Sequence, residues 1–169
     1  MHAAHRMSLI AGALLLAGTA QAADTSKKDT EYLQKSAQGL MSEVKMGEMA
    51  QKQAADARVK QFGKRMVDDH GKDLQALRQL ASQKHVTLPD APDSEQQEEI
   101  DKLAKLSGAD FDKEYVKYEM KDHKDDVKEN GKTMKKAADP EVRHFAGAEY
   151  RTVLAHRKEI DALHAQLGK

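Results

Sequence analysis

One stretch of this chain occurs twice: KQAADARVKQF at residues 52–62 and KKAADPEVRHF at residues 135–145. Asp56 and Asp139 hold the same place in the two copies, and Asp is a favoured residue at the N-cap of a helix. Pro140 follows Asp139 directly and suits the first position of a helix, where no backbone N–H is needed. Each copy therefore predicts a tight corner between two helices, so the chain reads as one helical hairpin used twice.

Apolar residues at helical spacing run away from both corners. They predict helices at about residues 25–55, 57–85, 107–137 and 140–166, with a short amphipathic stretch at 95–106 inside the one long connection. Ser26, Ser94 and Ser107 are the expected N-caps, because each has an acidic or amide residue three positions later. Two short turns and one long crossover predict an all-α fold, a ferritin-like four-helix bundle built from two hairpins.

The first residues read as a secretory signal peptide. His5 and Arg6 form a short basic flank, residues 9–17 are apolar, and residues 20–22 read Ala-Gln-Ala, a typical cleavage site. We therefore divide the chain into a signal peptide, 1–22, and a bundle domain, 23–169. No later segment has the roughly 20 apolar residues of a membrane helix. The mature protein is expected in the periplasm or secreted, and association with the outer membrane stays open.

The composition excludes several classes of function. The chain has 28 Lys and Arg against 28 Asp and Glu, so it lacks the basic excess of a general nucleic-acid-binding protein. It has no Cys, which excludes disulfides, thiolate metal sites and a Cys nucleophile. We find no Gly-rich phosphate loop and no Ser nucleophile motif. These features favour binding over catalysis.

Four residues with metal-ligand side chains lie at matched distances from the corners. Glu43 lies about thirteen residues before Asp56 and His70 about fourteen after it. His123 and His156 lie about sixteen and seventeen residues from Asp139. Equal distances from a corner mean equal heights in an antiparallel hairpin. Each hairpin can thus bring one ligand per helix to a common level, which predicts one metal site.

The chemistry of this set suits a transition metal. Three imidazoles and one carboxylate can hold zinc, iron, manganese, copper or nickel, whereas calcium and magnesium prefer all-oxygen sites. Asp69 and Asp122 each precede a His, and we expect them to orient a His on a neighbouring helix. Glu119 lies one helical turn before His123 and is a candidate additional ligand or hydrogen-bond acceptor.

Two other functions remain open at this stage. The His and Glu residues could form a metal-free hydrogen-bonded network, in a periplasmic module for protein interaction or stress protection. The site could also belong to a mononuclear metalloenzyme of unknown substrate. Methionines at positions 41, 46, 49 and 66 would suit copper, although Met is also a common filler of helical cores.

The chain resembles an exported bacterial family known as domain of unknown function 4142. The resemblance rests on MVDDH at residues 66–70, VTLP at 86–89, FDKEY at 111–115, Asp122-His123 and His156. It covers nearly the whole mature chain and implies a ferritin-like bundle in the bacterial envelope. The family pattern has a Glu in the first helix and His residues at the places of His70, His123 and His156. It often has a Leu-Pro before the last His, and its absence here implies a straighter last helix.

Overall fold

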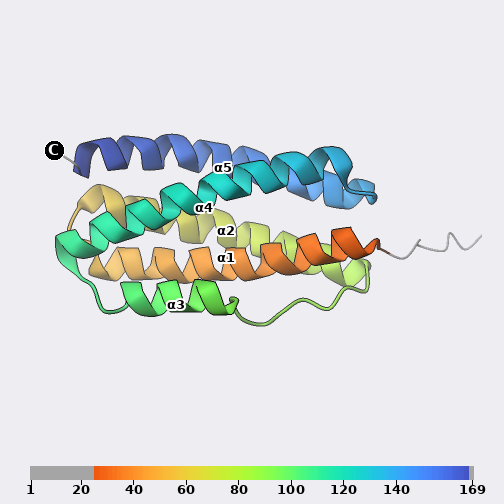
Figure 1. Ribbon diagram of the computed structural model, residues 1–169, viewed down its shortest axis with the longest axis horizontal. Coiled ribbons are helices and arrows are strands. Elements are labelled where there is room, and N and C mark those ends of the chain that lie inside the picture. Colours follow the sequence, from red (N-terminus) through yellow and green to blue (C-terminus); the bar gives the residue numbers. More distant parts are fainter. Residues whose placement is uncertain (1–24, 168–169) are drawn as a thin grey trace, which may run out of the picture.

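The computed structural model describes residues 25–167, which fold into five helices (Figure 1). In chain order these are α1 (Lys27–Gln53), α2 (Ala57–Gln83), α3 (Ser94–Leu103), α4 (Gly108–Lys136) and α5 (Pro140–Leu167). The predicted signal peptide, residues 1–22, lies outside the described residues. None of the five helices is long and apolar enough to cross a membrane.

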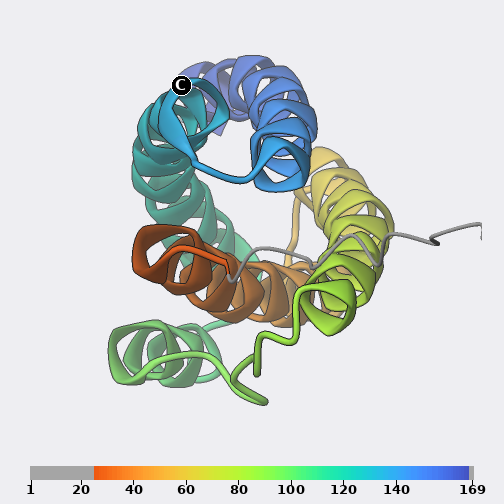
Figure 2. The same cartoon turned by 90° about the vertical axis from the view of Figure 1, so that its right-hand side faces the viewer.

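The fold is the predicted ferritin-like four-helix bundle. Two antiparallel hairpins, α1 with α2 and α4 with α5, pack side by side, and the crossover between them carries the short helix α3. Viewed along the bundle, the four long helices form a ring, and α3 lies outside it beside α1 (Figure 2). Helix α5 runs without interruption from Pro140 to Leu167.

The N-cap residue of α1 is the one predicted from the sequence, whereas the N-cap residue of α3 is not. Ser26 is the N-cap of α1, and its hydroxyl accepts a hydrogen bond from the backbone N–H of Asp29. The prediction that Ser94 caps α3 is wrong, because Asp93 takes that role and forms a capping box with Gln96. Ser107 precedes α4 without a side-chain hydrogen bond to the helix.

Each corner is held by a buried Asp from the other hairpin. The Asp112 carboxylate, near the start of α4, accepts hydrogen bonds from the backbone N–H groups of Ala55 and Asp56 at 3.1 and 2.9 Å. Asp29, in the first turn of α1, caps the second corner in the same way. The first corner therefore lies at the start of α4 and the second at the start of α1, so the two corners lie at opposite ends of the bundle (Figure 1).

The interior has two apolar clusters with a polar layer between them. Tyr115 packs against Phe62 in the cluster beside the first corner, with ring centroids 6.2 Å apart. Tyr32 packs against Phe145 in the cluster beside the second corner, at 6.4 Å. Met46 and Met66 are fully buried in the first cluster, where they act as packing residues. The polar layer lies between these clusters and contains the predicted ligands.

Candidate metal centre

Three fully buried histidines meet in the middle of the bundle. His70 comes from α2, His123 from α4 and His156 from α5, and each has one ring nitrogen within 4.8 Å of a nitrogen of the other two. The shortest approach joins His123 Nε2 to His156 Nδ1 at 3.4 Å. Each histidine occupies an inward position of its helix, so the apolar stripe that buries the helix also buries the imidazole.

His156 has a defined carboxylate partner. Its Nε2 lies 3.0 Å from Asp69 Oδ2 on α2. An ionised carboxylate only accepts hydrogen bonds, so Nε2–H of His156 is the donor. The Nδ1 lone pair is then free and faces His123. Asp69 also accepts from Arg65, at 3.3 Å. As expected from the sequence, Asp69 thus orients a His on a neighbouring helix.

His123 also has carboxylates on one edge of its ring. Its Nδ1 lies 3.3 Å from Glu119 Oε2 and 3.7 Å from Glu43 Oε1, while its Nε2 faces His156. A continuous chain of close contacts therefore runs from Glu119 through His123 and His156 to Asp69. The buried polar atoms in this chain of contacts can be satisfied either by protons shared between the side chains or by a bound cation.

His70 is the least satisfied of the three histidines. Neither of its ring nitrogens has a hydrogen-bond partner among the described residues, although the side chain is fully buried. Its nearest charged neighbour is Glu43, whose Oε2 lies 3.6 Å from Nδ1. A buried polar atom without a partner costs roughly 1–3 kcal/mol. A ligand for either ring nitrogen of His70 would remove this cost.

The candidate ligands form two groups, and Glu43 belongs to the one without His70 and His156. The three histidines form one group, and Glu43 forms a second with Glu119, Asp122 and His123. The four residues predicted from the sequence thus come together, but within 4.8 Å they are divided into two groups that share His123. All four residues lie near the middles of their helices. They therefore come together although the two corners lie at opposite ends of the bundle.

Other buried carboxylates surround the centre, and sequence reasoning did not single them out as site residues. Asp73 and Glu149 form a third group with His70, and Asp126 lies close enough to Glu43 and Glu149 to affect their ionisation. Asp73 and Glu149 belong to inward stripes, which is the signal that could have identified them. Among residues 25–167, no ion pair joins any of these three carboxylates to Lys or Arg.

Burial sets the electrostatics of the centre. It raises the pKa of Glu119 to about 8 and of Glu149 to about 9, and it raises the pKa of Glu43 well above its usual range. Burial lowers the pKa of His123 to about 4 and that of His70 well below its usual value. The histidines are therefore neutral at pH 7, which is the form that binds metal.

A comparison of the sequence with known protein families identifies the family of this chain. The sequence pattern of the family described as Domain of unknown function (DUF4142) matches residues 15–163. The chain belongs to this family. No curated protein sequence matches this DUF4142 member.

Solved structures with a similar fold include one protein, CopM, in two copper-bound forms. The structures titled "CopM in the Cu(II)-bound form" and "CopM in the Cu(I)-bound form" each match the DUF4142 chain with a TM-score of 0.69 and 16% identity, over 82% of this chain and 96% of that one. The "DUF305 fragment from Deinococcus radiodurans" matches with a TM-score of 0.72 and 13% identity, over 86% and 99%. At these identities the likeness supports the fold of this chain.

Proposed function

We propose that this protein is an exported metal-binding protein that holds one transition-metal ion in the middle of its bundle. Glu43, His70, His123 and His156 are the residues that hold the ion, and Asp69 orients His156. The proposal includes cleavage of residues 1–22 and a location in the periplasm or outside the cell. Its role is to bind and retain the ion.

The unsatisfied state of His70 carries the proposal. Its two ring nitrogens are fully buried and have no hydrogen-bond partner in residues 25–167. Protons can satisfy the chain from Glu119 to Asp69, but no hydrogen bond to a described residue satisfies His70. A metal ion at this point uses the lone pair of His70 and removes the cost of burying it.

The spacing of the ligand atoms also supports the proposal. Two atoms bound at 2.0–2.1 Å to one tetrahedral ion lie about 3.4 Å apart. His123 Nε2 and His156 Nδ1 are 3.4 Å apart, and His70 Nδ1 and Glu43 Oε2 are 3.6 Å apart. Each pair therefore already has the spacing of two ligands of one ion, and Glu43 must move toward the three histidines for all four residues to bind the same ion.

The ligand set narrows the choice of metal. Zinc, iron, manganese, copper and nickel all accept imidazole and carboxylate, but affinity for such ligands is highest for copper(II), followed by nickel and zinc. The copper-bound states of the CopM structures agree with copper as the first candidate. In this protein copper binding would rest on the histidines, because Met46 and Met66 lie in the apolar core.

Elemental analysis of the mature protein tests the proposal. The protein should be purified from the periplasm without a His tag, beside a His70→Ala/His123→Ala variant. We expect about one equivalent of a transition metal in the parent protein and none in the variant. A Glu43→Gln variant, which keeps the size of the side chain, should bind the same metal more weakly.

The matched control is a His144→Ala/His164→Ala variant, because both of these histidines are exposed. It should retain the metal, and circular dichroism should show that every variant is still helical. Metal in the His70→Ala/His123→Ala protein at the parental level would contradict the assigned ligands. A parent protein that neither contains metal nor takes it up on titration would show a proton-satisfied network and direct the search to protein partners.

A further inference from the structure

The second ligand group is richer in oxygen than the histidine group. Ligand atoms of Glu43, Glu119, Asp122 and His123 all lie within 4.8 Å of one another. Glu43 reaches this point from α1, and the other three lie within five consecutive residues of α4. Three carboxylates and one imidazole edge thus meet between α1 and α4.

Most of these atoms have no partner. Both carboxylate oxygens of Glu119, Oε1 of Glu43 and Nδ1 of His123 are buried without a hydrogen bond to any described residue. Glu119 is 0% exposed and Glu43 is 2% exposed. Within residues 25–167, no Lys or Arg pairs with Glu43, Glu119 or Asp122. Burying three carboxylates together in this way requires protons or a cation.

This group is separate from the histidine site because two residues offer a different atom to each. Glu43 directs Oε2 at His70, at 3.6 Å, and Oε1 at His123, at 3.7 Å. His123 has Nδ1 on the side of the carboxylates and Nε2 on the side of His156. The carboxylate group and the histidine group therefore lie on opposite edges of the His123 ring.

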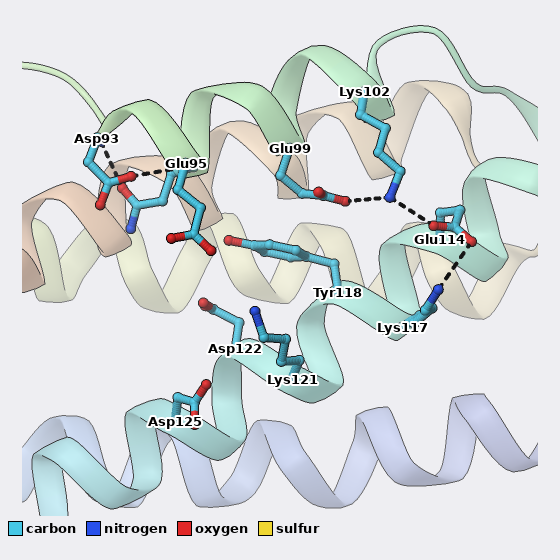
Figure 3. Close-up of a pocket in the computed structure, with 11 residues that line it drawn as sticks. Asp93, Glu95, Glu99, Lys102, Glu114, Lys117, Tyr118, Lys121, Asp122 and Asp125 are labelled. Carbon is cyan, nitrogen blue, oxygen red and sulfur yellow. Dashed lines mark hydrogen bonds and ion pairs between the residues drawn. The ribbon is translucent and has the colours of Figure 1, made fainter.

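The carboxylate group has a route to solvent. Asp122 is partly exposed and lines a groove of about 400 Å³ between α3 and α4. Figure 3 shows Asp122 and Tyr118 in this groove, with Glu95 of α3 opposite and Asp125 one turn along α4. Three lysines also line it: Lys102 pairs with Glu99 and Glu114, Lys117 pairs with Glu114, and Lys121 lies beside Asp122. The acidic residues of the groove outnumber these lysines. The acidic residues around Asp122 attract cations to its mouth.

We propose that Glu43, Glu119 and Asp122 form a second cation site, which binds a divalent ion that prefers oxygen ligands, such as Mn²⁺. The ion enters along the groove between α3 and α4 and meets Asp122 first. Glu43 lies between the two ions and gives one oxygen to each. Carboxylate oxygens suit manganese, whereas the imidazoles of the neighbouring site suit copper or zinc. The second site goes beyond the proposed function and does not depend on it.

A titration with two metals tests the second site. The mature full-length protein is first loaded with one equivalent of Zn²⁺ and then titrated with Mn²⁺, with free Mn²⁺ measured by electron paramagnetic resonance. We expect one further equivalent of Mn²⁺ to bind while the zinc stays bound. Asp122→Asn should weaken Mn²⁺ binding at least tenfold and leave zinc binding within about twofold. Glu119→Gln should also weaken Mn²⁺ binding at least tenfold, and it should weaken zinc binding as well, because Glu119 contacts the ring of the zinc ligand His123. Asp110→Asn, an exposed Asp on the same helix, should change neither.

The outcomes separate this proposal from the proposed function. Zinc binding without uptake of Mn²⁺, or release of one zinc for each Mn²⁺ bound, would overturn the second site and leave the histidine site standing. Mn²⁺ binding that both variants retain at full strength would also overturn it. Mn²⁺ binding that Asp122→Asn abolishes, in a protein that binds no zinc, would support the second site and contradict the histidine site. Because Asp122 is partly exposed, Asp122→Asn gives a readable result even if Glu119→Gln unfolds the protein.

Discussion

At the scale of single residues, the contact between Asp69 and His156 decides how firmly one imidazole is held. Asp69 Oδ2 lies 3.0 Å from Nε2, the nitrogen of His156 that faces away from the other histidines. Carboxylates in this position fix the tautomer of a metal-binding His and raise its basicity, and their loss typically weakens metal binding 10–100-fold. Asp69→Asn removes the charge and keeps the shape.

We expect Asp69→Asn to weaken metal binding by about 10–100-fold while the helical content stays unchanged. Competition with a coloured chelator measures the affinity. Asp68→Asn is the matched control, since Asp68 is the neighbouring carboxylate but is exposed and pairs only with Lys64 at 2.5 Å. Equal affinities for the two variants would show that Asp69 does not support the metal ligand.

At the scale of elements, the two corners explain how the hairpins fasten to each other. The buried Asp112 carboxylate accepts two backbone N–H groups at the first corner, and Asp29 does the same at the second. The sequence interval that separates Asp56 from Asp139 also separates Asp29 from Asp112. The repeat therefore includes the residue that caps the corner as well as the corner itself.

Asp112→Ala should lower the free energy of unfolding by about 1.5–3 kcal/mol, because it removes the charged acceptor of two backbone N–H groups at the corner. Urea denaturation measures the change. Asp110→Ala is the control in the same turn of α4, where the side chain is exposed, and it should cost less than about 1 kcal/mol. A loss at Asp112 no greater than at Asp110 would mean that the corner is satisfied by other groups.

The contact between α1 and α2 depends on two glycines. A methyl group on Gly63 would lie 2.6 Å from Ala50 Cβ and 2.8 Å from the Gly47 carbonyl oxygen. Gly63→Ala should therefore push the helices apart and destabilise the protein by about 1–3 kcal/mol. It should also weaken metal binding, because Glu43 and His70 lie on these two helices.

Gly71→Ala provides the comparison in the same helix, since a methyl group there would meet no atom of residues 25–167 within 4 Å apart from its own stretch of helix. It should stabilise the protein by about 0.5–1 kcal/mol, through better helix propensity. Thermal unfolding of the two variants measures whether Gly63→Ala lowers the stability and Gly71→Ala raises it. Destabilisation of similar size at the two positions would contradict the role of close packing at Gly63.

At the scale of the whole molecule, the sequence predicts the bundle well because its signals are local. The repeated corner at Asp56 and Asp139 defines the hairpins, and the apolar stripes bring His70, His123 and His156 inside. The division of the ligands into two groups could not be predicted, because it depends on which atom of Glu43 and His123 faces which neighbour. The capping role of Asp112 was likewise hidden, since it joins residues far apart in the sequence.

The buried carboxylates give the whole molecule an expected dependence on pH. Glu119 has a pKa of about 8 in the folded protein, above the usual value of 4.5, so the folded state keeps a proton that the unfolded chain releases. His123 has the opposite shift, to about 4 from 6.5, so it adds stability as the pH rises from 4 to 6.5. Above pH 6.5 the unfolded histidines are largely neutral, and the carboxylates dominate.

The free energy of unfolding of the metal-free protein should therefore fall between about pH 6.5 and 8, by up to about 1.4 kcal/mol per pH unit for each such carboxyl. A bound cation replaces these protons. The free energy of unfolding of the metal-bound protein should therefore not fall over this pH range. Urea unfolding across this range, with and without metal, measures both curves. Glu119→Gln should reduce the slope of this decline in the metal-free protein, whereas exposed Glu141→Gln should not. Stability that stays level or rises with pH in the metal-free protein would show that Glu119 is ionised in the folded state, so that neighbouring groups already balance its charge.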